Sequence, residues 1–164
     1  MNNKFTNGKP GGDNESLGHI TLAQYVKKRN GVALGAKGSL SNMLRNALGA
    51  ISFHHFWLYW NPIWGYYLGR YVMQPASKLM PQGLATVTTF VVSGLLHDVA
   101  ISLIKMQLVL VLTPWFGVMG VVAYISKHYK FSLAHWPWIV RAVVNVSIIV
   151  ACYLVARQGA VLIS

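Results

Sequence analysis

The chain has 164 residues, 54% of them apolar and only 10% charged, with 14 Lys and Arg against 3 Asp and Glu and a net charge of +11. Soluble domains have about 25% charged residues, so this composition excludes an ordinary soluble domain. It also excludes disorder, whose signature is low hydrophobicity. The length predicts one domain. The basic residues lie scattered between apolar runs, which favours a membrane protein with basic flanks and no nucleic-acid partner.

The first 39 residues are polar and basic. Residues 1–18 are rich in Asn, Gly and Lys and predict a polar, mobile tail. Residues 19–39 form a basic segment, in which 19–30 predict a short amphipathic helix that ends at Gly31. Such a helix is expected among the lipid headgroups, with the basic run Lys27-Lys28-Arg29 toward anionic lipid.

The predicted membrane domain, 40–164, begins with an aromatic element over residues 40–73. Apolar residues at helical spacing from Leu40 to Ile51 predict a helix. A serine at its start, Ser39 or Ser41, is a suitable N-cap.

A break is predicted inside this element, at Asn61-Pro62. Proline disfavours helical backbone at the residue before it. The aromatic stretch 63–73 that follows is too short to span a membrane, and its aromatics suit the membrane interface. We therefore predict that 40–73 is bent and is re-entrant or interfacial.

Three longer apolar runs follow: 83–103, 106–125 and 138–156. Each has the length of a transmembrane helix, since a span needs about 20 residues. Pro114 is expected to kink the second run. The fold class predicted from these segments is an all-α integral membrane protein with about three to five transmembrane helices.

The basic flanks predict the topology. Two groups of basic residues lie on opposite sides of the three runs: Arg70, Lys78, Lys127 and Lys130 on one, Lys105 and Arg157 on the other. The larger group is expected in the cytoplasm. The basic N-terminal stretch is expected there too, and the protein is expected in a bacterial inner membrane.

His97 and Asp98 interrupt the first long run. Ionisable groups at such a depth are costly and are functional candidates. His97 is therefore either a general base or a structural histidine bonded to another helix. Neighbours on a helix point about 100° apart, so Asp98 is not expected to pair with His97. We expect Asp98 to anchor the helix to Arg70 or Arg141 instead.

A second polar cluster lies at His54-His55 and Asn61, among aromatics. Adjacent histidines project in different directions, and few acids are present to help, so we predict no metal site. Asn61 stands beside a forced chain break, from which its amide can point into a cavity.

Together, the segments 53–62 (FHHFWLYWNP) and 89–98 (TFVVSGLLHD) resemble the membrane-bound O-acyltransferase (MBOAT) superfamily, most closely its wax-synthase-like branch. That superfamily has a polar motif at a membrane-embedded bend, which Trp60-Asn61 matches. It also has a later apolar helix of the form F-x-x-S-G/A-x-x-H, and residues 90–97 fit it position by position.

The resemblance implies acyl transfer from a thioester such as acyl-CoA to a hydroxyl acceptor, with no bound cofactor. His97 would be the general base, and Asn61 would orient the donor or steady developing charge. Four residues would support this pair: Trp60, Ser93, Asp98 and His55. The Ser93 hydroxyl would bond either the imidazole or a backbone carbonyl.

The resemblance also suggests where the substrates bind. Three residues are candidates for donor or acceptor binding: Trp57, Arg70 and Tyr67. The alternative for Tyr67 is packing against helices. Arg70 would either meet CoA phosphates or reach lipid headgroups.

The chain is shorter than full members of the superfamily, and the resemblance covers about residues 50–100. A partner subunit or a second copy would then complete the substrate tunnel. Two alternatives remain open: a non-catalytic membrane subunit that keeps the acyltransferase core, and a small proton-coupled transporter that uses His97 or Asp98.

Overall fold

The computed structural model describes residues 20–161, which are helical and contain no strand. The described helices are, in chain order, α1 (Leu22–Asn30), α2 (Ser39–Leu48), α3 (Phe53–Tyr59), α4 (Pro62–Leu68), the π-helix η2 (Gly69–Met73), α5 (Gln74–Leu79), α6 (Gln82–Lys105), α7 (Leu112–His128) and α8 (Trp138–Val161). The all-α prediction is confirmed for this part of the chain, and the predicted tail 1–18 lies outside it.

The predicted amphipathic helix forms as α1. Thr21 and Gln24 make a reciprocal capping box, in which each side chain accepts from the other residue's backbone N–H, at 3.3 and 2.9 Å. Gly31 ends the helix with φ 79°, a left-handed conformation that glycine adopts without strain. Tyr25 and Val26 are buried, and the basic residues of the last turn face outward or lie half-buried.

The predicted break at Asn61-Pro62 is present, between α3 and α4, and a further break at residues 49–52, between α2 and α3, was not predicted. The predicted cap of α2 is wrong. Gly38, at φ 83°, is the N-cap and makes no side-chain cap bond. Ser39 is instead bonded by the Asn30 side chain, whose Nδ2 donates to Ser39 Oγ at 2.8 Å and to Ser39 O at 2.9 Å.

Helices α6 and α7 form an antiparallel hairpin with the most extensive packing in the described fold. Helix α6 matches the predicted run 83–103, but α7 begins at Leu112, six residues later than predicted. Pro114 therefore lies in the first turn of α7, where its missing N–H costs no hydrogen bond and produces no kink.

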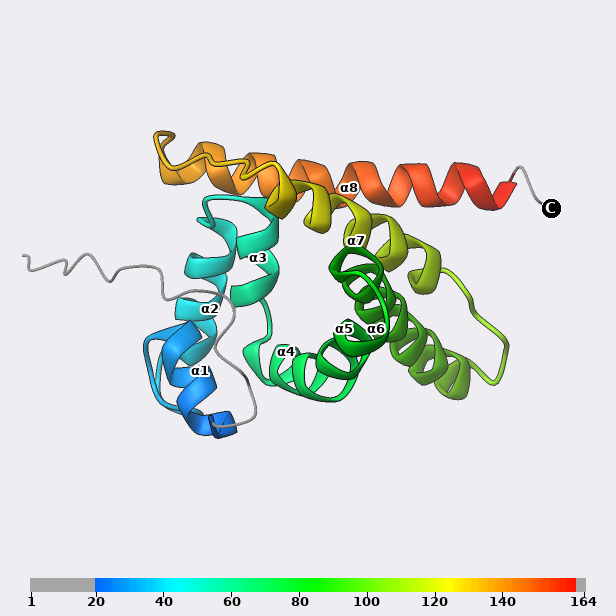
Figure 1. Cartoon of the computed structure of the whole chain (residues 1–164), viewed down its shortest axis with the longest axis horizontal. Coiled ribbons are helices and arrows are strands. Elements are labelled where there is room, and N and C mark those ends of the chain that lie inside the picture. Colours follow the sequence, from blue (N-terminus) through cyan, green and yellow to red (C-terminus); the bar gives the residue numbers. More distant parts are fainter. Residues whose placement is uncertain (1–19, 162–164) are drawn as a thin grey trace, which may run out of the picture.

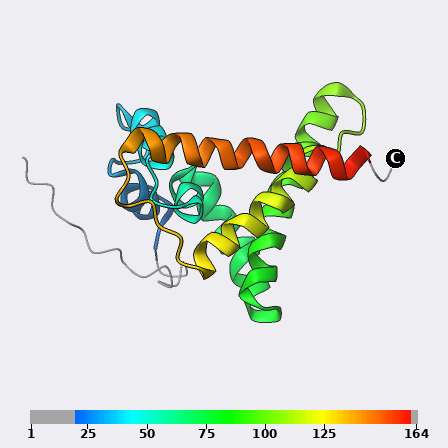
Figure 2. The ribbon, with the colours of Figure 1, turned by 90° about the horizontal axis from the view of Figure 1, so that it is seen from above.

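Helix α8 lies across the α6–α7 hairpin, as Figures 1 and 2 show. It contacts α7, α2 and α3. The fully buried Asn145 fastens it, since Asn145 Nδ2 donates to the carbonyl oxygens of Leu48 at 3.3 Å and Ala50 at 3.0 Å. A buried cluster of α3, α7 and α8 residues completes the core: Phe53, Met119, Ala123 and Cys152.

Two described helices, α6 and α8, are long and apolar enough to cross a membrane. The sequence predicted three such helices. Helix α7 has 17 residues, and this length corresponds to about 25 Å, less than the ~30 Å of a hydrocarbon core. Its late start explains the difference, because residues 106–111 form a loop instead of extending the helix.

Candidate active-site cavity

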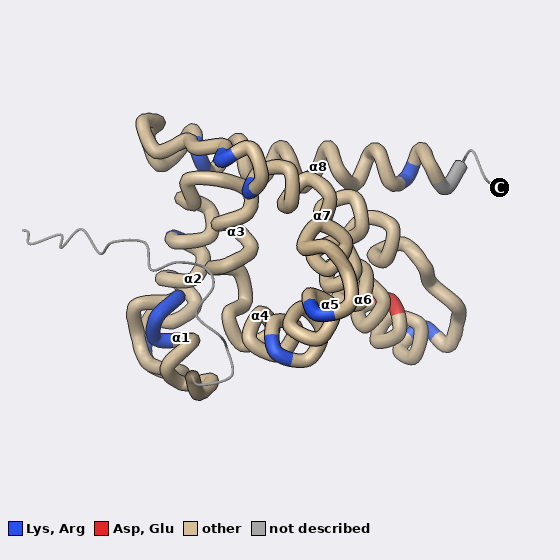
Figure 3. Tube along the Cα trace, viewed as in Figure 1, with Lys and Arg blue, Asp and Glu red and all other residues tan. Residues whose placement is uncertain are grey.

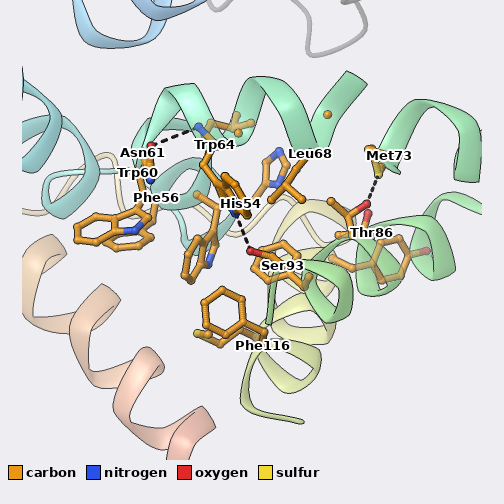
Figure 4. A pocket seen from close by; sticks show the side chains of 18 of the residues that line it. His54, Phe56, Trp60, Asn61, Trp64, Leu68, Met73, Thr86, Ser93 and Phe116 are labelled. Carbon is orange, nitrogen blue, oxygen red and sulfur yellow. Dashed lines mark hydrogen bonds between the residues drawn. The ribbon is translucent and has the colours of Figure 1, made fainter. Parts of the chain in front are cut away.

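A cavity of about 610 Å³ lies between the short helices α1, α3 and α4 and the α6–α7 hairpin (Figure 4). This volume is typical of cavities that bind small molecules, roughly 300–1,000 Å³. The walls are mainly aromatic and aliphatic, with residues from every side: Phe56, Trp57, Leu68, Met73, Phe90, Trp115, Phe116 and Met119.

One face of α6 lines the cavity along most of the helix. Apart from the adjacent pair Thr89 and Phe90, the residues on this face are three or four positions apart, which places them on one side of a helix: Gln82, Thr86, Thr89, Phe90, Ser93 and His97. Gln82 and His97 are fifteen residues apart, about 22 Å along the axis. The cavity is therefore long enough for an extended chain, with His97 at one end of this face.

His97 lines the cavity and has a defined ring orientation. Its Nδ1 lies 2.7 Å from the backbone oxygen of Ser93. A carbonyl oxygen only accepts, so Nδ1 has the proton and donates it. This bond leaves the lone pair on Nε2, the atom that can act as a base. The rings of Trp64 and Phe116 flank the imidazole, with centroids at 5.8 and 5.3 Å.

Asn61 also lines the cavity, at the break between α3 and α4. Its φ of 42° is left-handed, a conformation that asparagine tolerates better than most residues. Its side-chain Oδ1 accepts from the backbone N–H of Trp64 at 3.2 Å and so caps α4. The cap uses the oxygen of the amide, and the donor group of the same side chain is Nδ2.

Trp64 is the site residue that the sequence analysis missed. Its backbone bonds Asn61, and its indole Nε1–H donates to the Ser93 hydroxyl at 3.0 Å (Figure 4). Its ring meets that of His97 edge to face, at an interplanar angle of 83°. One signal was present in the sequence: Trp64 is three residues after Asn61, the position that an asparagine N-cap bonds.

Trp57 and Trp60, two further predicted site residues, line the same cavity. The ring of Trp57 meets Phe90 edge to face at 5.1 Å, and its buried Nε1–H has no hydrogen-bond partner within the described chain. Trp60 stacks on Phe56 at 5.5 Å. Ser93 lies in the wall as well. Its hydroxyl accepts from the Trp64 indole and its carbonyl accepts from His97 Nδ1, so the hydrogen bond between Ser93 and the imidazole is made by the backbone oxygen of Ser93.

Asp98 points away from the cavity, into the start of α7. Its carboxylate accepts from the N–H groups of Val111, Leu112 and Thr113 at 3.2, 2.9 and 2.7 Å, and from the Thr113 hydroxyl at 2.7 Å. The prediction that Asp98 pairs with Arg70 or Arg141 is therefore wrong. The first N–H groups of a helix lack internal acceptors, and here a carboxylate from another helix supplies one.

Three other predicted residues lie outside the cavity wall. His55 Nδ1 lies 2.8 Å from the Ser52 hydroxyl, at the start of α3. Arg70 donates to the Tyr66 hydroxyl at 2.7 Å and lines a separate shallow hollow near α5 with Lys78. Tyr67 is exposed and stacks on Tyr71. The structure therefore does not bring these residues to His97.

The charged residues that do line the cavity are all basic: Lys28, Arg29 and Lys127. Lys28 and Arg29 come from α1, and Lys127 from the last turn of α7. Lys28 and Arg29 were predicted to contact lipid headgroups, and Lys127 to flank a membrane helix. Asp98 is the single acid among residues 20–161 and caps the start of α7, whereas Figure 3 shows basic residues on α1, η2, α5 and α8. The cavity wall is thus suited to an anionic group.

No group of three metal-binding side chains occurs within the described residues. In the comparisons with known proteins, no family model, no curated protein and no solved structure matches the chain. A functional assignment therefore depends on the cavity and on the motif resemblance.

Proposed function

We propose that the protein is a membrane O-acyltransferase, similar to the wax-synthase-like branch of the MBOAT superfamily. The main support is that a single apolar cavity is lined by both His97 and Asn61. These two residues are 36 positions apart in the sequence and come from different helices. The Nδ1 bond of His97 supports its role as base, because it leaves Nε2 able to accept a proton.

The proposed reaction needs no acyl-enzyme. His97 Nε2 takes the proton of an acceptor hydroxyl as its oxygen attacks the thioester carbonyl. The carbon–sulfur bond then breaks, the new ester leaves, and the thiolate takes the proton from His97. Asn61 Nδ2 donates to the carbonyl oxygen, on which negative charge develops during the attack.

The donor is an acyl thioester with an anionic carrier, such as acyl-CoA. The apolar wall along α6 and α7 suits an acyl chain, and the three basic residues Lys28, Arg29 and Lys127 suit phosphate groups. No bound cofactor takes part in this scheme. Hydroxyl acceptors include sugars, lipid alcohols and protein side chains.

The proposed location is the bacterial inner membrane, with the N-terminus in the cytoplasm. The length and apolar character of α6 and α8 support insertion, and basic residues near the predicted cytoplasmic ends support the orientation. A partner subunit or a second copy completes the tunnel around the cavity.

The function is tested with purified protein, decanoyl-CoA and separate acceptors: a fatty alcohol, a sugar and a serine-containing peptide. The measurement is acceptor-dependent release of free thiol. His97→Ala should slow release at least about 100-fold, the usual contribution of a general base. His135→Ala is the matched control, since His135 is exposed in the loop before α8. Equal release by wild type and His97→Ala, or no acceptor-dependent release by wild type, contradicts the proposal.

A further inference from the structure

We infer that Trp64 is a positioning residue, which fixes the imidazole of His97 and couples it to Asn61. This inference rests on the proposed function, in which these two residues act on the reacting groups. Among residues 20–161, Trp64 alone both hydrogen-bonds Asn61, through its backbone N–H and Asn61 Oδ1, and makes a ring contact with His97.

The first link runs through the backbone of α4. Asn61 caps the helix by accepting from the Trp64 N–H at 3.2 Å. Pro62 occupies the first helical position, where its fixed φ suits the helix. The left-handed turn at Asn61 and the cap together define where the first turn of α4 begins, and hence where the Trp64 indole projects.

The second link crosses from α4 to α6. The indole Nε1–H donates to Ser93 Oγ at 3.0 Å, and Ser93 is 3% exposed. The carbonyl of this same serine accepts from His97 Nδ1. Trp64 therefore holds the residue that sets the tautomer of the base, in a buried place where a lost hydrogen bond is costly.

The third link is direct. The Trp64 ring meets the imidazole edge to face at 5.8 Å, and Phe116 lies against the imidazole at 5.3 Å. These two ring contacts and the Nδ1 bond together restrict the imidazole to one orientation, so Nε2 keeps one direction. Catalysis by a positioned base depends on this, since a misplacement of about 1 Å can cost 100-fold in rate.

The test compares Trp64→Phe with Trp136→Phe. Trp64→Phe keeps a ring in the wall and removes the Nε1–H bond; Trp136 is exposed in the loop before α8. Ser93→Ala removes the same hydrogen bond from the other side, so it serves if Trp64→Phe does not fold. Two readouts are taken: NMR of the ¹⁵N-labelled imidazoles, with His97 assigned from His97→Ala, and the rate of thiol release from decanoyl-CoA.

We expect wild-type His97 to show one tautomer, with the proton on Nδ1. In Trp64→Phe and Ser93→Ala its signals should shift or broaden, and kcat should fall about 10-fold or more with KM nearly unchanged. In a His97→Ala background, Trp64→Phe should cause no further loss, because Trp64 acts through His97. Trp136→Phe should change neither readout.

Unchanged His97 signals in both Trp64→Phe and Ser93→Ala overturn the inference. It is also overturned if Trp64→Phe lowers the rate by the same factor in the wild-type and in the His97→Ala background. These outcomes are separate from failure of the proposed function. If His97→Ala leaves thiol release unchanged, the acyltransferase proposal fails, while the imidazole spectra still decide whether Trp64 positions His97.

Discussion

Asn61, at the break between α3 and α4, has a structural role in addition to any chemical role. Asn61 adopts φ 42° and caps α4 through Oδ1. Asparagine suits both the left-handed backbone and the N-cap position. These two structural features would favour asparagine here even without a reaction. The chemical role in the proposed mechanism depends on the other end of the same amide, Nδ2. Substitutions that change one end separate the two roles.

The Asn61→Asp variant separates the structural role of Asn61 from its chemical role. Aspartate caps helices as well as asparagine does, so the free energy of unfolding should change by less than about 0.5 kcal/mol. The variant has no Nδ2 donor, so thiol release from decanoyl-CoA should fall at least about 100-fold. Asn61→Gly is the control that keeps the left-handed backbone without an amide, and it should be slow as well. Full activity of Asn61→Asp would reduce Asn61 to a helix cap.

Asp98 is 1% exposed and accepts four hydrogen bonds at the start of α7. Asp98→Asn replaces one acceptor oxygen with a donor that faces the Thr113 N–H and hydroxyl. We expect a loss of about 1.5–3 kcal/mol in unfolding free energy, the range for hydrogen bonds to charged groups.

The measurement is thermal unfolding in detergent, with Thr113→Ser as control because serine keeps the hydroxyl donor. An unchanged midpoint for Asp98→Asn would show that the carboxylate does not hold α7. A proton-coupled transporter that used Asp98 in place of His97 would need this carboxylate to exchange protons, and each exchange would break part of the cap on α7.

At the scale of helices, the α6–α7 hairpin is defined by glycine as much as by apolar surface. A Cβ on Gly94 would meet Leu112 O and Thr113 Cα at 2.8 Å, both of them backbone atoms that cannot rotate away. It would also meet Phe116 Cβ at 2.9 Å. Residue 94 therefore sets how closely α7 approaches α6, and with it the position of the Phe116 ring against His97.

Gly94→Ala should destabilise the protein by about 1–3 kcal/mol, as overpacking does. The matched control is Gly159→Ala in α8, where a new Cβ meets nothing within 4 Å; it should be neutral or stabilising by up to about 1 kcal/mol through helix propensity. Unfolding in detergent measures both. Equal stability of the two variants would mean that the hairpin opens at little cost.

At the scale of the whole molecule, two candidate spans lie crosswise, with α8 over the α6–α7 hairpin (Figure 2). The hairpin is antiparallel, so Lys105 at the end of α6 and Lys130 just after α7 lie at its opposite ends. If α6 crosses the membrane, these two lysines face opposite compartments, and the basic flanks predict Lys130 in the cytoplasm.

Labelling of single cysteines tests this topology. In a Cys152→Ala background, which removes the only native thiol, Lys105→Cys should react with a membrane-impermeant maleimide added to intact bacterial cells. Lys130→Cys should react only after lysis. Lysed cells provide the control that both sites are reactive. The same pattern at both sites in intact cells would contradict a crossing by α6.

Much of the helix pattern was predictable because it depends on neighbouring residues. Thr21, Gln24 and Gly31 bound α1, and Pro62 ends α3 through a local steric effect. The start of α7 was not predictable in this way, since apolar character continues from Met106 and the signal that starts the helix, Asp98, is on another helix.

The candidate site also contains residues that local sequence predicted and residues that it did not. His97 and Asn61 stood out as a histidine in an apolar run and an amide beside a proline. Arg70 and Tyr67 were selected for chemistry alone and lie outside the cavity wall. Lys127 and Arg29 line it because α1 and α7 fold toward the same space, which no local pattern encodes.

By itself, the sequence determined an apolar, basic, all-helical chain, the long helix α6 and the break at Asn61, because composition and local backbone sterics act over a few residues. Tertiary structure alone decided the partners of the buried Asp98, the cavity and the place of Trp64 between Asn61 and His97. The Asp98 bonds span 13 to 15 positions of sequence, and the contacts of Trp64 with α6 span 29 and 33. Only the packing of helices sets which of these groups meet.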